Sequence, residues 1–177
     1  MLYLCLMQKL KTCAFIDGSN IYFAQKKINI WLDWGKVKLY LEKKYDIKAI
    51  RYYIGIRKND RTSQTFLKKL EKIRFTIIKK PVKIITNEFG KKIEKANFDV
   101  EITADIMTSL KKIDAVVLFS GDSDFAYLAE LLNRQKKQIF VYSSKKTLSW
   151  ELKLSAHRYF FIDNLSLLTK RRRFIRI

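Results

Sequence analysis

The chain contains few of the residues that interrupt, loosen or cross-link a fold. One proline and five glycines among 177 residues argue against long structureless linkers. The two cysteines, Cys5 and Cys13, are too few for the disulfide framework of a small secreted domain. The one histidine, His157, stands far from both cysteines, so the residue types of a zinc site are not gathered anywhere in the sequence.

Several nucleotide-binding and catalytic motifs are also missing. No G-x-G-x-x-G follows the first apolar run, and neither a P-loop nor a G-x-S-x-G motif occurs. The apolar opening at residues 1–7 is short and has no basic segment before it, so we expect neither a signal peptide nor a membrane span. A cytoplasmic location without membrane association is the resulting expectation.

Positive charge is abundant. Lysine and arginine number 37 against 17 aspartate and glutamate, a formal net charge of +20. Such an excess attracts polyanions by releasing their condensed counterions, and nucleic acid is the commonest large partner of this kind. A lysine-rich composition that serves only general solubility is the alternative, because the sequence does not show the charges on one face.

Short β-rich runs alternate with amphipathic helical stretches, which predicts a mostly parallel sheet with helices on both faces. The strand-like runs are Cys13–Asp17, Ile47–Ile56, Phe75–Ile85, Ala115–Ser120, Gln138–Tyr142 and Tyr159–Ile162. Helical periodicity predicts amphipathic helices whose apolar faces are formed by Phe66/Leu70/Ile73, by Val100/Ala104/Met107/Leu110 and by Phe125/Leu128/Ala129/Leu132. Residues 83–95 suit a β-hairpin or an extended loop. We expect one domain over 1–177, with its core at about 13–164 and a short basic tail at 165–177.

Two polar turns directly follow strand-like runs. The first is Ile16-Asp17-Gly18-Ser19-Asn20, and the second is Ser120-Gly121-Asp122-Ser123-Asp124-Phe125. If the two strands are neighbours where the strand order reverses, both turns line one crevice. Carboxylates gathered there stay ionised only if a cation compensates them, and an all-oxygen set suits Mg²⁺ or Mn²⁺.

A third acidic segment begins a predicted helix at Asp99. Asp105 lies six residues further, about 240° around the helix, so the two cannot face one ion and Asp99 is the better candidate. Each turn also has a simpler interpretation, because Asp122, Ser123 and Ser19 are common helix N-caps. For Glu101 and Asp105, solvated surface charge is the competing interpretation.

These residues resemble the NYN domain family, in particular its LabA-like branch, which is related to PIN-domain nucleases. The matching pieces are Ile16–Asn20, Lys95–Val100 and Ser120–Phe125, in this order, within a pattern that runs from about Cys13 to Asn164. The resemblance implies a three-layer PIN-like (Rossmann-like) α/β sandwich with a Mg²⁺-dependent acidic site. Ala96 is a departure, since relatives often have glycine after the lysine.

The resemblance also implies roles for individual residues. Metal ligands, direct or through water, would be Asp17, Asp99, Asp122 and Asp124. Asn20 would shape the site and belong to the catalytic set, while Asp105 matches a recurrent acidic position. Supporting residues around these would be Ser19, Ser120, Ser123 and Asp105. Apart from the resemblance, the candidate contacts to nucleic acid are Lys95, Arg171, Arg172 and Arg173, although a basic run at the end of a chain is more often a solvated end than a specific site.

The resulting hypothesis is a metal-dependent endoribonuclease that uses Mg²⁺ or Mn²⁺ on single-stranded RNA. A basic body that collects RNA and an acidic crevice that accepts phosphate only with metal favour a nuclease over a simple binder. Two alternatives stay open at this point: a non-catalytic RNA-binding or regulatory protein, and a PIN-like DNA nuclease. The sequence also leaves a homodimer open.

Overall fold

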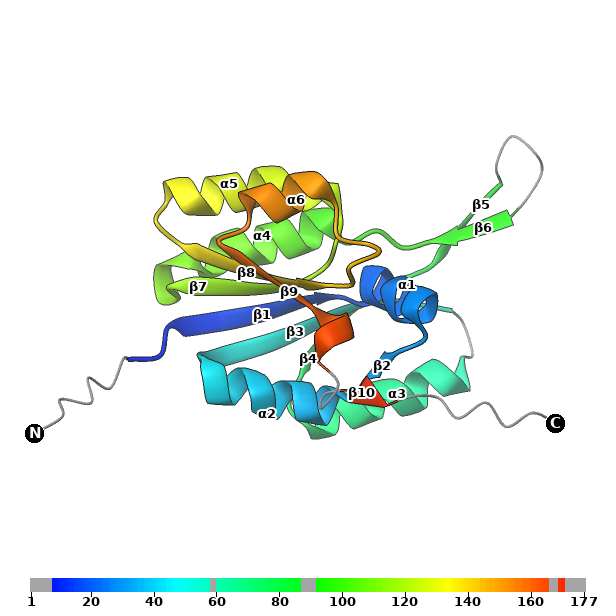
Figure 1. Cartoon of the computed structure of the whole chain (residues 1–177). Coiled ribbons are helices and arrows are strands. Elements are labelled where there is room, and N and C mark those ends of the chain that lie inside the picture. The colour runs from blue at the N-terminus through cyan, green and yellow to red at the C-terminus, as the bar shows by residue number, and fades with distance from the viewer. Residues whose placement is uncertain (1–7, 58–59, 87–91, 166–168, 171–177) are drawn as a thin grey trace, which may run out of the picture.

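The computed structural model describes residues 8–57, 60–86, 92–165 and 169–170. Its centre is a six-stranded sheet in the order β4-β3-β1-β7-β8-β9, in which every neighbouring pair is parallel (Figure 1). The strands are β1 Lys11–Asp17, β3 Asp46–Ile56, β4 Thr76–Pro81, β7 Ala115–Phe119, β8 Gln138–Ser143 and β9 Arg158–Phe161. The six predicted strand regions are confirmed, and the third ends at the proline expected to break it.

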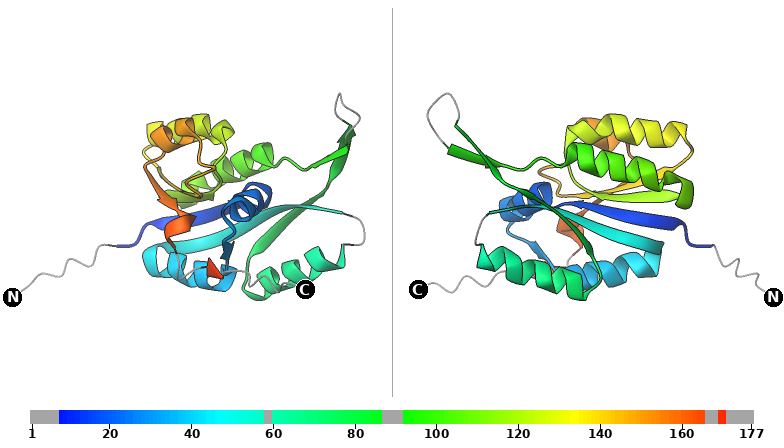
Figure 2. Two further views of the ribbon diagram at one scale, coloured as in Figure 1. Left: turned by 45° about the vertical axis from the view of Figure 1, so that its right-hand side comes forward. Right: turned by 180° about the vertical axis from the view of Figure 1, so that it is seen from behind.

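Helices cover both faces of the sheet (Figure 2). One face carries α1 Gly18–Ile28, α2 Trp34–Lys44 and α3 Arg61–Lys72, and the other carries α4 Asp99–Ser109, α5 Ala126–Arg134 and α6 Trp150–Ser155. Successive residues of β7 explain the two cores: Val117 packs with the first set of helices, whereas Val116 and Leu118 pack with the second. The predicted three-layer sandwich with a mostly parallel sheet is thus confirmed.

Smaller elements connect or extend these layers. β5 Lys83–Thr86 and β6 Lys92–Lys95 form an antiparallel hairpin, as predicted, and it projects from the body of the molecule (Figures 1 and 2). β2 Trp31–Leu32 pairs with β10 Thr169–Lys170. Short 3₁₀ turns lie at η1 Leu110–Lys112, η2 Ser123–Phe125 and η3 Ile162–Asn164. Within the described part of the chain, no helix is long and apolar enough to cross a membrane.

The buried face of α4 agrees only in part with the one that periodicity predicted, since Leu110 is buried and Met107 packs against the core but the other two predicted residues do not. Val100 is 79% exposed and Ala104 is exposed, whereas Ile102 and Ile106 are fully buried. Both faces of this helix carry apolar residues, so local pattern alone does not choose between them. In contrast, the predicted face of η2 and α5, which begins at Phe125, is buried throughout.

Candidate functional site

The acidic residues lie where the strand order reverses. β1 and β7 are parallel neighbours, with Ile16 opposite Phe119, so Asp17 and Ser120 leave the sheet side by side. From this pair the chain continues to β3 and β4 on one side and to β8 and β9 on the other. Loops diverge at such a reversal and leave a crevice at the carboxyl edge of the sheet. The structure therefore places both predicted turns at one edge.

A hydrogen bond joins the two turns directly. Asn20, in the first turn of α1, accepts a hydrogen bond at Oδ1 from the backbone N–H of Gly121, at 2.9 Å. The carbonyl of Gly121 in turn accepts from the N–H of Ser149, at 2.9 Å. A Cβ on Gly121 would meet the carbonyl of Thr147 and the hydroxyl of Ser143, so only glycine fits here. Asn20 thus connects the first turn of α1 to the loop that carries Asp122.

Asp17 is the most buried carboxylate of the group. It is 7% exposed, and its Oδ1 caps α1 by accepting from the N–H of Asn20 at 3.0 Å. The pKa of Asp17 is raised from 3.8 to about 6, chiefly by burial; the charges of Asp99 and Asp122 contribute to the rise, and the N–H groups of Asn20 and Ser19 oppose it. Carboxylates from three separate segments consequently act on one another at this edge.

Asp122 and its neighbours form the second part of the site. Asp122 is half-buried and caps η2, since its Oδ1 accepts from the N–H of Asp124 at 3.2 Å. Its own N–H donates to the hydroxyl of the buried Ser120, at 3.3 Å. Ser123 and Asp124 are exposed. The capping interpretation therefore holds for Asp122 but not for Ser19 or Ser123, and Asp17 is a cap that was not predicted. Each cap uses one carboxylate oxygen and does not exclude a metal-binding role.

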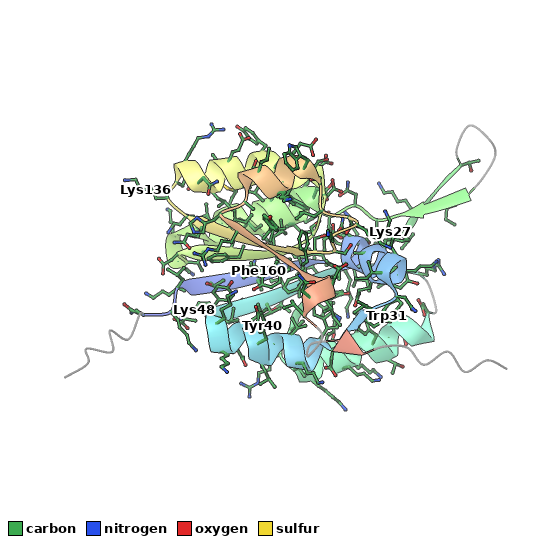
Figure 3. All side chains as sticks on the ribbon, viewed as in Figure 1. Lys27, Trp31, Tyr40, Lys48, Lys136 and Phe160 are labelled. Atoms are coloured by element: carbon green, nitrogen blue, oxygen red, sulfur yellow. The ribbon has the colours of Figure 1, made fainter. Side chains whose placement is uncertain are left out.

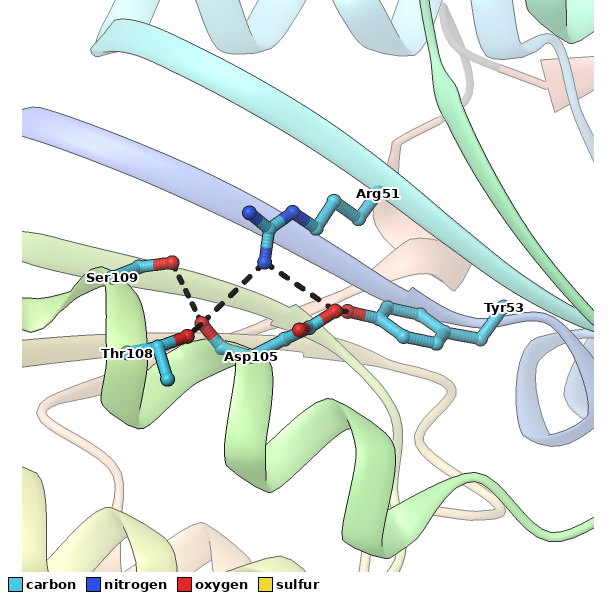
Figure 4. Close-up of polar contacts among 5 residues, drawn as sticks. All are labelled: Arg51, Tyr53, Asp105, Thr108 and Ser109. Atoms are coloured by element: carbon cyan, nitrogen blue, oxygen red, sulfur yellow. Dashed lines mark hydrogen bonds and ion pairs between the residues drawn. The ribbon is translucent and has the colours of Figure 1, made fainter.

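Asp99 and Asp105 point to different surroundings on α4. Asp99 is the first residue of the helix, half-buried, and its charge reaches Asp17. Asp105 instead accepts a 2.6 Å hydrogen bond from the hydroxyl of Tyr53 and pairs with Arg51 at 3.4 Å (Figure 4). These contacts hold α4 against β3. Asp105 therefore lies outside the acidic cluster and supports the helix that presents Asp99.

The number of donors bears on which metal fits. Among the described residues, no three Asp, Glu, His or Cys side chains stand close enough together to hold a metal ion. Zinc takes four tetrahedral protein ligands in structural sites and three in catalytic sites, so it does not suit this edge. Mg²⁺ keeps several waters and is commonly bound through one or two carboxylates and a substrate phosphate. The oxygen donors present are compatible with that mode.

Two neighbours of the site were missed by sequence reasoning. The end of β8 and the loop after it pack against Gly121: β8 ends at the buried Ser143, and the loop continues with the buried Ser144 and the exposed Lys145 and Lys146. In the sequence this loop is marked by a polar turn directly after an apolar strand, which is the same pattern that identified the aspartates. Tyr52 of β3 is the other neighbour, and burial together with the charge of Asp17 raises its pKa. No local pattern marks a tyrosine inside a strand as part of a site.

The basic residues expected to contact nucleic acid are not among the described side chains. The side chain of Lys95 and the residues Arg171, Arg172 and Arg173 lie outside the described part of the chain. Elsewhere, lysines are spread around the molecule: Lys48 and Lys136 lie at the end of the sheet opposite Lys27 (Figure 3). The positive charge is thus not confined to one end.

Comparison with known proteins identifies the family. Residues 11–164 match the NYN domain. The chain belongs to the NYN domain family. It is 30% identical over 159 residues to the low amplitude and bright protein LabA of Synechococcus elongatus, covering 88% of this chain and 85% of that protein. The predicted LabA-like branch is thereby confirmed, and with it the relation of this NYN domain to PIN-like nucleases.

A solved structure supports the same fold. A Vibrio parahaemolyticus protein, described as being of unknown function, superposes with a TM-score of 0.76 at 25% identity. The match covers 89% of this chain and 96% of the other. The sandwich is therefore shared over nearly the whole length of both proteins.

Proposed function

We propose that this NYN domain hydrolyses RNA phosphodiester bonds at the acidic edge, in the presence of Mg²⁺ or Mn²⁺. The observation that carries the proposal is the convergence of Asp17, Asp99 and Asp122 at the reversal of strand order, with Asp17 buried and its pKa raised. A buried carboxylate beside two others is unfavourable for stability, and evolution tolerates such strain mainly where function uses it. Membership of the NYN domain family supports a nucleic-acid substrate.

The aspartates would hold the metal. We assign this role to Asp17, Asp99, Asp122 and Asp124, acting directly or through bound water. When bound, such an ion would supply Lewis acidity, which would lower the pKa of a neighbouring water and offset the negative charge that develops on the phosphate and the leaving oxygen. Asp124 is exposed at the start of η2, so it is the member best placed to act through water.

The protein's own groups supply position and charge. Asn20 keeps the loop of Asp122 against α1, and the Asp105 contacts with Tyr53 and Arg51 keep α4, and hence Asp99, against the sheet. Ser120 holds the backbone of Asp122. The net charge of +20 attracts the RNA backbone, whereas the uncompensated carboxylates repel phosphate until a cation is present.

The test is single-turnover cleavage of end-labelled single-stranded RNA and of DNA with the same sequence, each with Mg²⁺, Mn²⁺ or EDTA. RNA cleavage with either metal and none in EDTA is expected. Asp17→Asn should reduce cleavage by orders of magnitude and leave RNA binding in EDTA intact or stronger. Asp114→Asn is the control, because this exposed carboxylate lies at the amino end of β7.

Each other result has a defined meaning. Undiminished cleavage by Asp17→Asn would assign the activity to another site or a contaminant. RNA binding without cleavage under every metal condition would replace the proposal with a non-catalytic regulatory role, which the lack of three close metal donors in the described chain would then explain. Preference for DNA would indicate a PIN-like DNA nuclease.

A further inference from the structure

An aromatic pocket of about 580 Å³ opens beside the acidic site. Its walls come from α1, β2, β3 and α3, and Gly18 and Ser19, which directly follow Asp17, form part of its lining. The volume falls in the range of about 300–1,000 Å³ that is typical of sites for small organic ligands. The pocket and the acidic site are therefore neighbours at the same edge of the sheet.

Tyr52 forms a wall that the two sites share. Its ring lines the pocket, and its pKa is raised partly by the charge of Asp17 on the other side. A Cβ on Gly18 would lie 2.7 Å from the ring of Tyr52, which shows how closely α1 approaches β3 here. A ligand in the pocket would thus lie next to any phosphate held near Asp17.

Several aromatic rings at the pocket are available to a ligand. Tyr22 is 48% exposed and Phe23 is 64% exposed, and both are on α1. The ring of Tyr22 contacts that of Trp31 at a centroid distance of 5.7 Å (Figure 3 shows Trp31 below α1), and Phe66 packs on Tyr52 at 5.7 Å. Planar aromatic faces of this kind stack on nucleobases irrespective of their sequence.

The polar groups of the pocket suit an uncharged ring better than a phosphate. Among the described residues of the lining, Arg57 and Asp60 are the charged side chains, and the carboxylate of Asp60 accepts hydrogen bonds from the backbone and hydroxyl of Ser63 at 3.0 and 2.5 Å. One basic and one acidic side chain in this described lining do not select for anions, in contrast to the strongly positive chain as a whole. The charge of the whole chain attracts the strand, and the pocket offers its bases a place out of water.

From this juxtaposition we infer that the pocket binds one unpaired nucleobase of the RNA strand whose neighbouring phosphate lies at the acidic site. The inference rests on the proposed function for the identity of the strand. Sequence-specific recognition of RNA commonly uses unstacked bases held on aromatic side chains.

The test measures base binding without chemistry. In EDTA, adenosine, guanosine, cytidine and uridine 5′-monophosphates are titrated to about 10 mM, since unassisted base binding commonly falls in the millimolar range. Ribose 5-phosphate, which lacks the base, is titrated alongside. The readout is tryptophan fluorescence in a Trp150→Phe background, so that Trp31 and Trp34, which both line the pocket, are the two remaining tryptophans.

We expect at least one nucleotide to quench this fluorescence saturably and ribose 5-phosphate not to do so. Tyr22→Ala and Phe23→Ala should each weaken the binding by at least about fivefold, the lower range for loss of one stacking ring. Tyr127→Ala is the matched control, since Tyr127 is 66% exposed on α5, away from the pocket, and it should leave the affinity unchanged.

Failure of this inference is distinguishable from failure of the proposed function. The pocket assignment is overturned if no nucleotide quenches, if ribose 5-phosphate binds equally well, or if neither Tyr22→Ala nor Phe23→Ala weakens binding. Normal RNA cleavage together with any of these results would leave the nuclease proposal standing. Base-dependent binding that both variants weaken supports the pocket even in a protein that cleaves no RNA.

Discussion

Replacing Asp17 with asparagine should make the metal-free protein more stable at neutral pH. The carboxylate is 7% exposed, and its pKa in the folded protein is raised from 3.8 to about 6, chiefly by burial and then by Asp99 and Asp122. A pKa raised by folding means that the folded state holds the proton more tightly than the unfolded state. Stability therefore falls as pH rises from about 3.8 to about 6, and the penalty is complete above that range.

The size of the effect follows from the same values. A difference of about two pKa units corresponds to about 3 kcal/mol of unfavourable free energy in the charged folded state. Asparagine caps a helix about as well as aspartate, so the hydrogen bond from Asn20 is retained. Loss of negative charge at the start of α1 costs about 0.3–1 kcal/mol. The net gain is therefore about 2 kcal/mol, or about 4–8 °C in Tm for a chain of this size.

Thermal unfolding in EDTA at several pH values measures this directly. The difference between Asp17→Asn and the wild type should be largest near neutral pH and should disappear well below pH 3.8, the pKa of the carboxyl in the unfolded chain, where the group is protonated in both states. Asp114→Asn is the control, because the carboxylate of Asp114 accepts a backbone hydrogen bond from the N–H of Lys11 at 3.2 Å, as Asp17 does from Asn20, but Asp114 is exposed. If Asp17→Asn destabilises at neutral pH, or its effect does not change with pH, the carboxylate is not held buried and charged.

Three further predictions concern the metal, the loops and the support of α4. Mg²⁺ or Mn²⁺ at ten times its dissociation constant should stabilise the wild type by about 1.4 kcal/mol, which corresponds to a rise in Tm of about 3–6 °C. Asp122→Asn should largely remove this rise in Tm. An unchanged rise would exclude Asp122 as a ligand. Gly121→Ala should lower the free energy of unfolding, measured in urea, by about 1–3 kcal/mol, because the added Cβ has no space beside the loop after β8. Gly35→Ala is the control and should not lower it, because a Cβ there would lie 3.4 Å from its nearest neighbour. Equal free energies of unfolding for the two variants would contradict this packing. Tyr53→Phe should lower the free energy of unfolding by about 1–2 kcal/mol, because the hydrogen bond to Asp105 is lost. A double-mutant cycle with Asp105→Asn should show a coupling energy between the two residues. A coupling energy of zero would show that the two side chains do not interact.

Much of the fold was predictable because each element is encoded by local pattern. β7 is a continuous apolar run that suits a strand covered on both faces, and its five residues are all buried. The polar turns that begin at Asp17 and Ser120 were recognisable because they interrupt such runs abruptly. Strand–helix alternation then restricts the sheet to parallel, right-handed connections, which is why the sandwich could be expected without coordinates.

Local pattern could not choose between two apolar faces of α4. Val100 and Ile102 are both apolar, yet the first is exposed and the second is buried. The choice depends on what the helix packs against, including the contacts of Asp105 with Tyr53 and Arg51 across to β3. Tyr53 and Arg51 lie 52 and 54 residues from Asp105 in the chain, so no window of helical periodicity contains them.

By itself, the sequence determined that turns containing aspartate follow two of the buried strands, and that the chain carries a large positive charge. Only the tertiary structure decided that Asn20 bonds to Gly121, 101 positions away, and that Asp17 lies within electrostatic reach of Asp99 and Asp122. It also decided that an aromatic pocket shares the wall of Tyr52 with this cluster. The physical reason is that strand identity is a local property, whereas strand order, and therefore which loops meet, depends on the packing of the whole sheet.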